Sequence, residues 1–172
     1  SMISLNQIET GNNEMEYDHF DIVALLEGMI QSMKILLQQN DISLSFAHDQ
    51  EIFVYADEYS VEQVVSNYLS NAIHYAKNEK KIDIKLTKKE HVLRVSVFNT
   101  GDPIPQDSME HIWDKFYKVD KARTREYGGS GIGLSIVKAI MESHHRECGA
   151  KNRENGVEFW FELDRRIIVD KL

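Results

Sequence analysis

The chain has 172 residues, of which 42% are hydrophobic, and a formal net charge of −8 at pH 7. A chain of this length can bury the core of one ordinary domain. Its acidic balance excludes a nucleic-acid partner held by clustered Lys and Arg. The single cysteine, Cys148, excludes an internal disulfide and a cysteine-rich metal site. No apolar run approaches the roughly 20 residues that cross a bilayer, so we expect a soluble, cytoplasmic region without membrane contact of its own.

The first elements are predicted to be helical. Residues 1–16 are typical of the end of a helix, with Gly11 in its stop signal. A second helix is predicted to begin at the capping residue Asp21. Its apolar positions form one stripe that faces the core: Ile22, Leu25, Leu26, Met29, Met33, Leu36 and Leu37.

The middle of the chain alternates strands and helices. Residues 42–46 and 52–55 predict short strands, and a third helix is expected from about residue 61 to 76. Ser60, with Gln63 three residues later, is typical of the capping box that begins such a helix.

Two longer strands are predicted over residues 82–87 and 92–98. Residues 99–130 then lack sustained periodicity, which in a compact domain indicates a functional loop. A fourth helix is expected over about 132–145. Two last strands, 147–151 and 157–163, flank the hairpin signal Asn155-Gly156. This order predicts an α/β fold, a two-layer sandwich with one mixed sheet of about five strands and three helices on one face.

A polar stripe lies on the third predicted helix. Gln63, Asn67, Asn71 and His74 fall within about 80° of one another at helical spacing. A solvated helix face would look similar, but Glu, Lys and Gln form such a face at less cost than Asn. Two asparagines one turn apart offer amide oxygens to a hard cation and N–H groups to phosphate.

The segment 99–130 carries three further patterns. Glycines at 128, 129, 131 and 133 precede the fourth helix, whose N-terminus suits phosphate, although a plain hinge would also use them. Asn99-Thr100-Gly101 follows a strand directly, where a polar side chain can read a base edge or simply begin a turn. Residues 112–118 place aromatics at helical spacing beside lysines. This pattern predicts a small lid helix, whose charge would suit phosphates or merely solvent.

In this order, the patterns resemble the catalytic domain of sensor histidine kinases, in the GHKL superfamily, over about residues 19–165. Residues 63–72 look like that family's N box and residues 99–105 like its first glycine box. Residues 113–117 look like the F box and residues 129–134 like the second glycine box. The resemblance implies the Bergerat ATP-binding fold, with residues 99–130 as the ATP lid. It divides the chain into a helix end and linker (1–16), a catalytic domain (17–165) and a tail (166–172).

The resemblance also implies roles for individual residues. Asn71 and Asn67 would hold Mg²⁺, and with Lys118 and Arg123 they would form the catalytic set. The implied ATP-binding residues are Asn67, Asn71, His74, Tyr75, Asn99, Gly101, Ile104, Phe116, Tyr117, Lys118, Gly129, Ser130, Gly131, Ile132, Gly133 and Leu134. The reaction would be transfer of the γ-phosphoryl group to a histidine, driven by positioning and charge stabilisation.

Three positions depart from the family pattern. Asn99 stands where Asp is usual, Pro103 replaces a glycine, and His74 stands where a basic residue is common. These changes favour an alternative interpretation, in which the domain is a pseudokinase that binds ATP poorly and serves as an interaction module. Water-activating ATPases of the superfamily are a second alternative, although they carry Glu where this chain has Asn67. Anti-sigma-factor serine kinases are a third.

None of the histidines is followed by the acid and the proline that mark the family's phosphoacceptor site. The substrate histidine is therefore expected on a dimerisation domain outside these residues. By the resemblance, the partners are that dimerisation/phosphoacceptor domain and a response regulator, and the full-length protein is a membrane-anchored sensor.

Overall fold

A mixed sheet is the framework of the molecule. The computed structural model describes residues 14–48, 50–118 and 133–165. In these residues the strands lie in the order β1-β3-β7-β5-β4-β2, and β6 pairs with β7 in addition. Of these strand pairs, β2–β4 is parallel and the others are antiparallel. The strands are β1 (Tyr17–Asp21), β2 (Ser43–Phe46), β3 (Phe53–Asp57), β4 (Lys81–Lys88), β5 (Val92–Thr100), β6 (Cys148–Arg153) and β7 (Gly156–Arg165).

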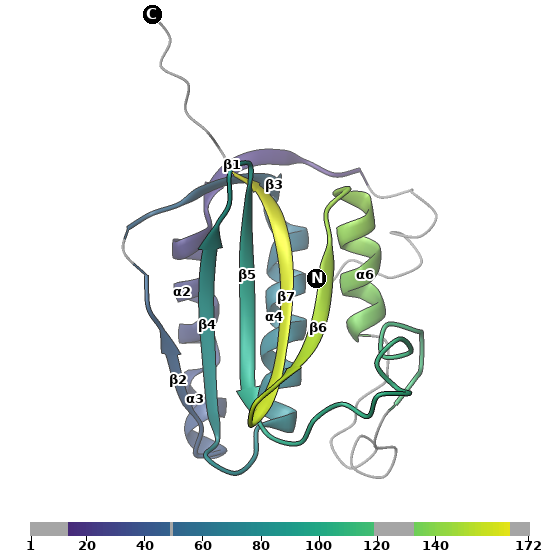
Figure 1. Cartoon of the computed structure of the whole chain (residues 1–172). Helices are drawn as coiled ribbons and strands as arrows, with labels where there is room; N and C mark the ends of the chain where they lie inside the picture. Colours follow the sequence, from purple (N-terminus) through teal and green to yellow (C-terminus); the bar gives the residue numbers. More distant parts are fainter. Residues whose placement is uncertain (1–13, 49, 119–132, 166–172) are drawn as a thin grey trace, which may run out of the picture.

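The helices of the described residues cover one face of this sheet (Figure 1). They are α2 (Ile22–Ser32), α3 (Lys34–Gln39), α4 (Glu58–Tyr75) and α6 (Gly133–Ser143). The predicted two-layer α/β sandwich is therefore confirmed, with seven strands in place of about five. The prediction missed β1. Its five residues, YDHFD, have no regular polar alternation, and the strand is defined by pairing with the distant β3.

Alternation along the central strands separates the core from the open face. In β7, Phe159, Phe161 and Leu163 are buried against the helices, where Tyr68 of α4 is only 1% exposed. The Tyr68 hydroxyl donates to the carbonyl of Trp160 at 2.9 Å, which satisfies the one polar group of that ring. The residues between them point to the open face, where the guanidinium of Arg94 lies 3.7 Å from the centre of the Trp160 ring.

The second predicted helix is interrupted. Asp21 caps it as expected, with its carboxylate accepting from the amide of Val23 at 3.0 Å. At Met33 the backbone leaves helical geometry (φ −97°, ψ 2°), and a separate helix, α3, follows. The prediction of one helix with a continuous apolar stripe was therefore wrong. The break buries Leu37 and leaves Leu36 42% exposed.

The third predicted helix begins earlier than its sequence signal suggests. The capping residue is Asp57, with extended backbone and a carboxylate that accepts from the amide of Ser60 at 2.8 Å. Ser60 lies inside the first turn, fully buried, and its hydroxyl contacts the sulfur of Met15. The capping box predicted at Ser60 was wrong because the preceding strand ends in a better acceptor.

Asp57 also joins three parts of the chain. Its second carboxylate oxygen accepts from the amide of Glu16 at 2.7 Å, just before β1. Its own amide donates to Nε2 of His144 at 3.1 Å, and Nδ1 of that ring pairs with the carbonyl of Ile140 in α6 at 2.9 Å. Burial lowers the pKa of His144, against the opposing effect of the nearby carboxylates. The ring is therefore held neutral where β1, α4 and α6 meet.

The helices α4 and α6 lie against each other in opposite directions. The end of α6 approaches Asp57 through His144, and its beginning lies beside Asn67, in the middle of α4. Because α6 has 11 residues and α4 has 18, α6 covers only the first half of α4. The end of α4, from Asn71 to Tyr75, extends beyond it.

No helix in the described ranges, 14–48, 50–118 and 133–165, is long and apolar enough to span a membrane.

Candidate functional site

The predicted N box and the second glycine box meet between α4 and α6. Asn67 is half-buried, and its amide nitrogen donates to the carbonyl of Gln63 one turn earlier at 2.9 Å. Its amide oxygen faces Gly133, at the start of α6, so closely that a Cβ on this glycine would lie 2.8 Å from it. The structure therefore brings these two motifs, 66 residues apart in the chain, into contact.

One turn beyond Asn67, the exposed half of α4 carries the other predicted residues. Asn71, His74 and Tyr75 are each half-buried. The rings of His74 and Tyr75 meet edge to face with centroids 4.4 Å apart. These side chains occupy the part of α4 that α6 leaves uncovered.

The end of β5 supplies the third part of the site. Asn99 is only 2% exposed and faces the helix layer with its strand partners Ile82 and Val157. Its amide nitrogen donates to the carbonyl of Thr100 at 3.1 Å. This hydrogen bond fixes the direction of the amide, and no donor in the described residues reaches the oxygen.

Gly101 fits tightly against the end of α4. Its φ is +150°, and a Cβ there would lie 2.6 Å from the carbonyl oxygen of Tyr75. Only glycine combines this backbone conformation with this approach. Asn99 and Gly101, predicted from sequence as one motif, therefore stand beside the uncovered turns of α4.

Thr100 closes this end of the sheet, a role that sequence reasoning missed. Its hydroxyl donates to the carbonyl of Lys77 at 2.8 Å and accepts from the amide of Lys81 at 2.9 Å. The amide of Lys77 returns a hydrogen bond to the carbonyl of Thr100. The loop after α4 is thus fixed to the end of β5, and the Lys77–Asp102 ion pair at 3.0 Å lies just outside.

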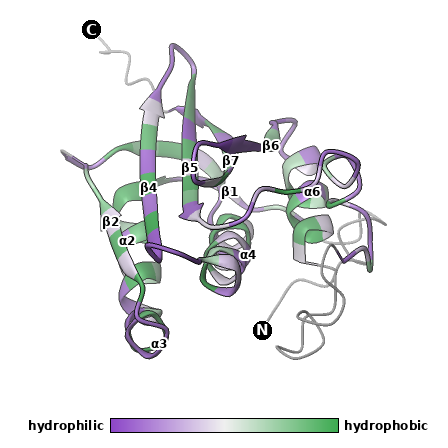
Figure 2. Cartoon of the chain, turned by 60° about the horizontal axis from the view of Figure 1, so that its bottom comes forward, coloured by the Kyte–Doolittle hydropathy of each residue, from purple (hydrophilic) through white to green (hydrophobic). Residues whose placement is uncertain are grey.

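The chain then leaves the sheet as residues 101–118, which we call the lid segment. Figure 2 turns this end of the molecule forward and shows the lid segment running from β5 toward α6. The small helix predicted at 112–118 was wrong, because the segment forms successive turns without an α-helix. Ile112 is buried and Trp113 packs on Phe159 (6.1 Å between ring centres), so the segment is nevertheless anchored in the core.

The exposed end of the lid segment carries three predicted residues. Phe116 is 69% exposed with left-handed backbone (φ +64°), which is costly for an aromatic residue. The Tyr117 hydroxyl bonds to the hydroxyl of Ser108 at 2.8 Å, and Lys118 is half-buried.

A second contact of the lid segment was also missed. The side-chain amide of Asn152, in β6, accepts from the amide of Ile104 at 2.8 Å and donates to its carbonyl at 2.9 Å. Nothing in the sequence near Asn152 indicates this contact, because it depends on how the β6–β7 hairpin meets a loop nearly 50 residues away.

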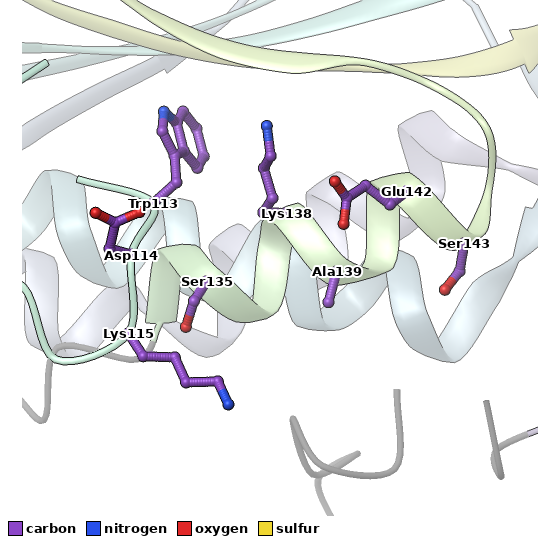
Figure 3. Close-up of a pocket in the computed structure, with 8 residues that line it drawn as sticks. All are labelled: Trp113, Asp114, Lys115, Ser135, Lys138, Ala139, Glu142 and Ser143. Carbon is purple, nitrogen blue, oxygen red and sulfur yellow. The ribbon is translucent and has the colours of Figure 1, made fainter. Parts of the chain in front are cut away.

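A hollow of about 570 Å³ lies between the lid segment and α6, lined by Trp113, Asp114, Lys115, Ser135, Lys138, Ala139, Glu142 and Ser143. Figure 3 shows Trp113 and Lys138 extending toward the same side, and Lys115 toward the other. None of the predicted nucleotide-binding residues that the structure describes is among the residues lining this hollow.

Five predicted residues, Arg123, Gly129, Ser130, Gly131 and Ile132, lie outside the described residues. The predicted helix end at the N-terminus and the tail after residue 165 do so too, apart from residues 14–16. Gly133 and Leu134 are described, and Leu134 packs partly buried against the core.

Comparisons with known proteins show the family to which the chain belongs. Residues 56–167 match the family described as "Histidine kinase-, DNA gyrase B-, and HSP90-like ATPase". The chain is 28% identical over 155 residues to the sensor histidine kinase WalK of Bacillus subtilis, covering 89% of this chain and 25% of that protein. It is 36% identical over 124 residues to the sensor protein kinase WalK of Staphylococcus epidermidis, covering 70% of this chain and 20% of that protein. The chain therefore spans about a quarter or less of the length of these relatives.

Solved structures of histidine kinases also superpose on this chain. The nucleotide-free catalytic domain of the histidine kinase ThkA superposes with a TM-score of 0.77 at 32% identity, covering 88% of this chain and 99% of that one. ThkA in complex with the response regulator protein TrrA superposes with a TM-score of 0.77 at 29% identity, covering 94% of this chain and 46% of that one.

The fold and the contact between the N box and the second glycine box define an ATP-binding domain of the GHKL type. The chain belongs to the histidine kinase-, DNA gyrase B-, and HSP90-like ATPase family, and within it to the catalytic domains of sensor histidine kinases.

Proposed function

We propose that this domain binds ATP with Mg²⁺ and transfers the γ-phosphoryl group to a histidine on its own dimerisation/phosphoacceptor domain. The phosphoryl group would then pass to a response regulator, and the domain would work on the cytoplasmic side of a membrane-anchored sensor. The contact between Asn67 and Gly133 carries this proposal, since it joins a pair of helical asparagines to a helix N-terminus.

The residues present fit a hydrated hard cation beside phosphates. The side-chain nitrogen of Asn67 donates to the carbonyl of Gln63, so the side-chain oxygen is the group that faces the start of α6. Asn71 lies one turn further along the half of α4 that α6 leaves uncovered. Amide oxygens are ligands that Mg²⁺ accepts together with waters and phosphate oxygens. The cation would neutralise charge that develops during transfer.

The adenine ring would lie against the end of β5. The side-chain nitrogen of Asn99 donates to the carbonyl of Thr100, so the side-chain oxygen would be the acceptor for the amino group of the base. Gly101 would let the ring approach the backbone, with Tyr75 and Ile104 as apolar neighbours. This arrangement supports nucleotide binding despite the change from Asp to Asn, and so favours a kinase over a pseudokinase.

The remaining predicted residues would surround the phosphates. Lys118 and Arg123 would supply positive charge, and Gly129, Ser130, Gly131 and Ile132 would offer backbone amides next to Gly133. Phe116 and Tyr117 would close the lid over the ligand, and His74 would contact phosphate in a way that depends on its protonation.

Calorimetric titration with a non-hydrolysable ATP analogue tests the proposal. We expect magnesium-dependent binding by the wild type and its loss in Asn71→Ala. Ser70→Ala is the matched control, since Ser70 is the exposed neighbour of Asn71 on the same helix. Absence of binding by the wild type at millimolar nucleotide would overturn the proposal in favour of a pseudokinase. Equal binding by Asn71→Ala would remove the metal role of that residue.

A further inference from the structure

The Asn152 side chain holds the lid segment in the manner of a neighbouring strand. Its side-chain oxygen accepts from the backbone amide of Ile104 at 2.8 Å, and its side-chain nitrogen donates to the carbonyl of Ile104 at 2.9 Å. Both residues are half-buried. An Asn side chain carries the same donor and acceptor as a peptide group, so it can satisfy both polar groups of one residue at once.

The sequence around Ile104 makes these two hydrogen bonds the main attachment of residues 103–105 to the sheet. Pro103 and Pro105 flank Ile104 and have no backbone N–H. Across residues 103–105, the amide of Ile104 is therefore the single backbone donor, and Asn152 takes it.

The tip of the same hairpin supplies a second anchor a few residues earlier. The amide of Gly101 donates to the carbonyl of Asn155 at 3.0 Å. Gly156 lies so close to the carbonyl of Asn99 that a Cβ there would collide with it. The β6–β7 hairpin thus fixes both ends of the stretch from Asn99 to Ile104, which leaves the sheet at the adenine side of the site.

We propose that Asn152 is a positioning residue for recognition of the adenine base. It holds Ile104 and the start of the lid segment in place before the nucleotide arrives. This inference rests on the proposed function. Without the two hydrogen bonds, binding must also order this stretch, and the ordering cost reduces affinity. The loss should fall on the base, because Asn67 and Asn71, which would hold the cation at the phosphates, belong to α4 and not to the stretch that Asn152 fixes.

Titration of ADP, with GDP as competitor, separates this role from a general structural one. We expect Asn152→Ala to bind ADP about tenfold more weakly and GDP less than about twofold more weakly, so that selectivity for adenine narrows. Asn152→Asp keeps the acceptor for the Ile104 amide but turns a carboxylate oxygen toward the Ile104 carbonyl, and it should bind ADP at least as weakly. The Ile104 amide should also exchange with solvent faster in both variants than in the wild type.

Arg153→Ala is the matched control. Arg153 follows Asn152 in the same strand, faces the open side of the sheet and pairs with Glu158. It should leave ADP binding unchanged. ADP affinity within about twofold of wild type in Asn152→Ala, or equal weakening of ADP and GDP, would overturn the inference. Failure of the wild type to bind ADP would instead overturn the proposed function on which the inference rests.

Discussion

Replacing Asp57 by alanine is expected to destabilise the domain more than replacing Ser60, the residue whose sequence signal predicts the helix cap, by alanine. The Asp57 carboxylate accepts from the amides of Ser60 at 2.8 Å and Glu16 at 2.7 Å. Alanine removes both acceptors at once. The amide of Ser60 is inside the protein, so water replaces the lost acceptor poorly, whereas Glu16 is exposed and its amide can be resolvated.

The magnitude follows from these two hydrogen bonds. Loss of a helix cap costs about 1 kcal/mol and up to about 2 kcal/mol at buried sites. A hydrogen bond to a charged acceptor contributes about 1.5–3 kcal/mol, less where the freed donor meets water. We therefore expect Asp57→Ala to lower the free energy of unfolding by about 2–3 kcal/mol. Asp57→Asn keeps one acceptor oxygen and should lose about half as much.

Urea unfolding followed by circular dichroism measures these differences, and Ser60→Ala is the decisive comparison. Among the described residues, the one hydrogen bond of the Ser60 hydroxyl is a weak one to the sulfur of Met15 at 3.4 Å, so its removal should cost less than about 0.5 kcal/mol. If Ser60→Ala cost more than Asp57→Ala, the helix would be capped as the sequence suggests, and the reasoning from the structure would be refuted.

Two further predictions concern α6. Gly133→Ala should leave the free energy of unfolding within about 1 kcal/mol of wild type, but weaken binding of the ATP analogue in calorimetry. The new Cβ would force the amide of Asn67 away, and unchanged binding would contradict this. The buried, neutral His144 has a lowered pKa, so its protonation favours the unfolded chain. Stability should be intact above about pH 6.5 and fall below it. Between pH 7.5 and 5.5 the loss from this one group is at most about 1.4 kcal/mol. Urea midpoints for wild type and His144→Gln should diverge as the pH falls, and parallel curves would rule the histidine out.

The sequence predicted the layers and the motifs well because both depend on local patterns. Alternation in β5 and β7 and the apolar spacing of α4 are visible in single segments, and the glycines mark tight contacts. The resemblance assigned Asn99 and Gly101 to one box and Gly133 to another, and the structure brings Gly101 beside Asn99 and Gly133 beside Asn67.

Two of the misses share one physical cause, which is that the deciding contact lies far away in the chain. The cap of α4 is a different case, because the Asp57 carboxylate accepts from the amide of Ser60 only three residues later. β1, in contrast, is a strand because the distant β3 pairs with it. Asn152 has no local signal, since its partner Ile104 is 48 residues away. Local propensity cannot report such contacts.

The position of β7 has a consequence for the order in which the domain can assemble. This strand pairs with β3, β5 and β6, and it alone joins the β1–β3 ribbon to the rest of the sheet, through Val54–Arg165 and Tyr55–Asp164. Yet it is the last strand of the described residues to leave the ribosome, and domains of this size complete folding only after such distant pairs form. Every predicted nucleotide-binding residue has been synthesised by Leu134. A chain stopped by premature termination between residues 135 and 155 would therefore carry the whole set of site residues, but not the strand that joins the β1–β3 ribbon to β5, β4 and β2.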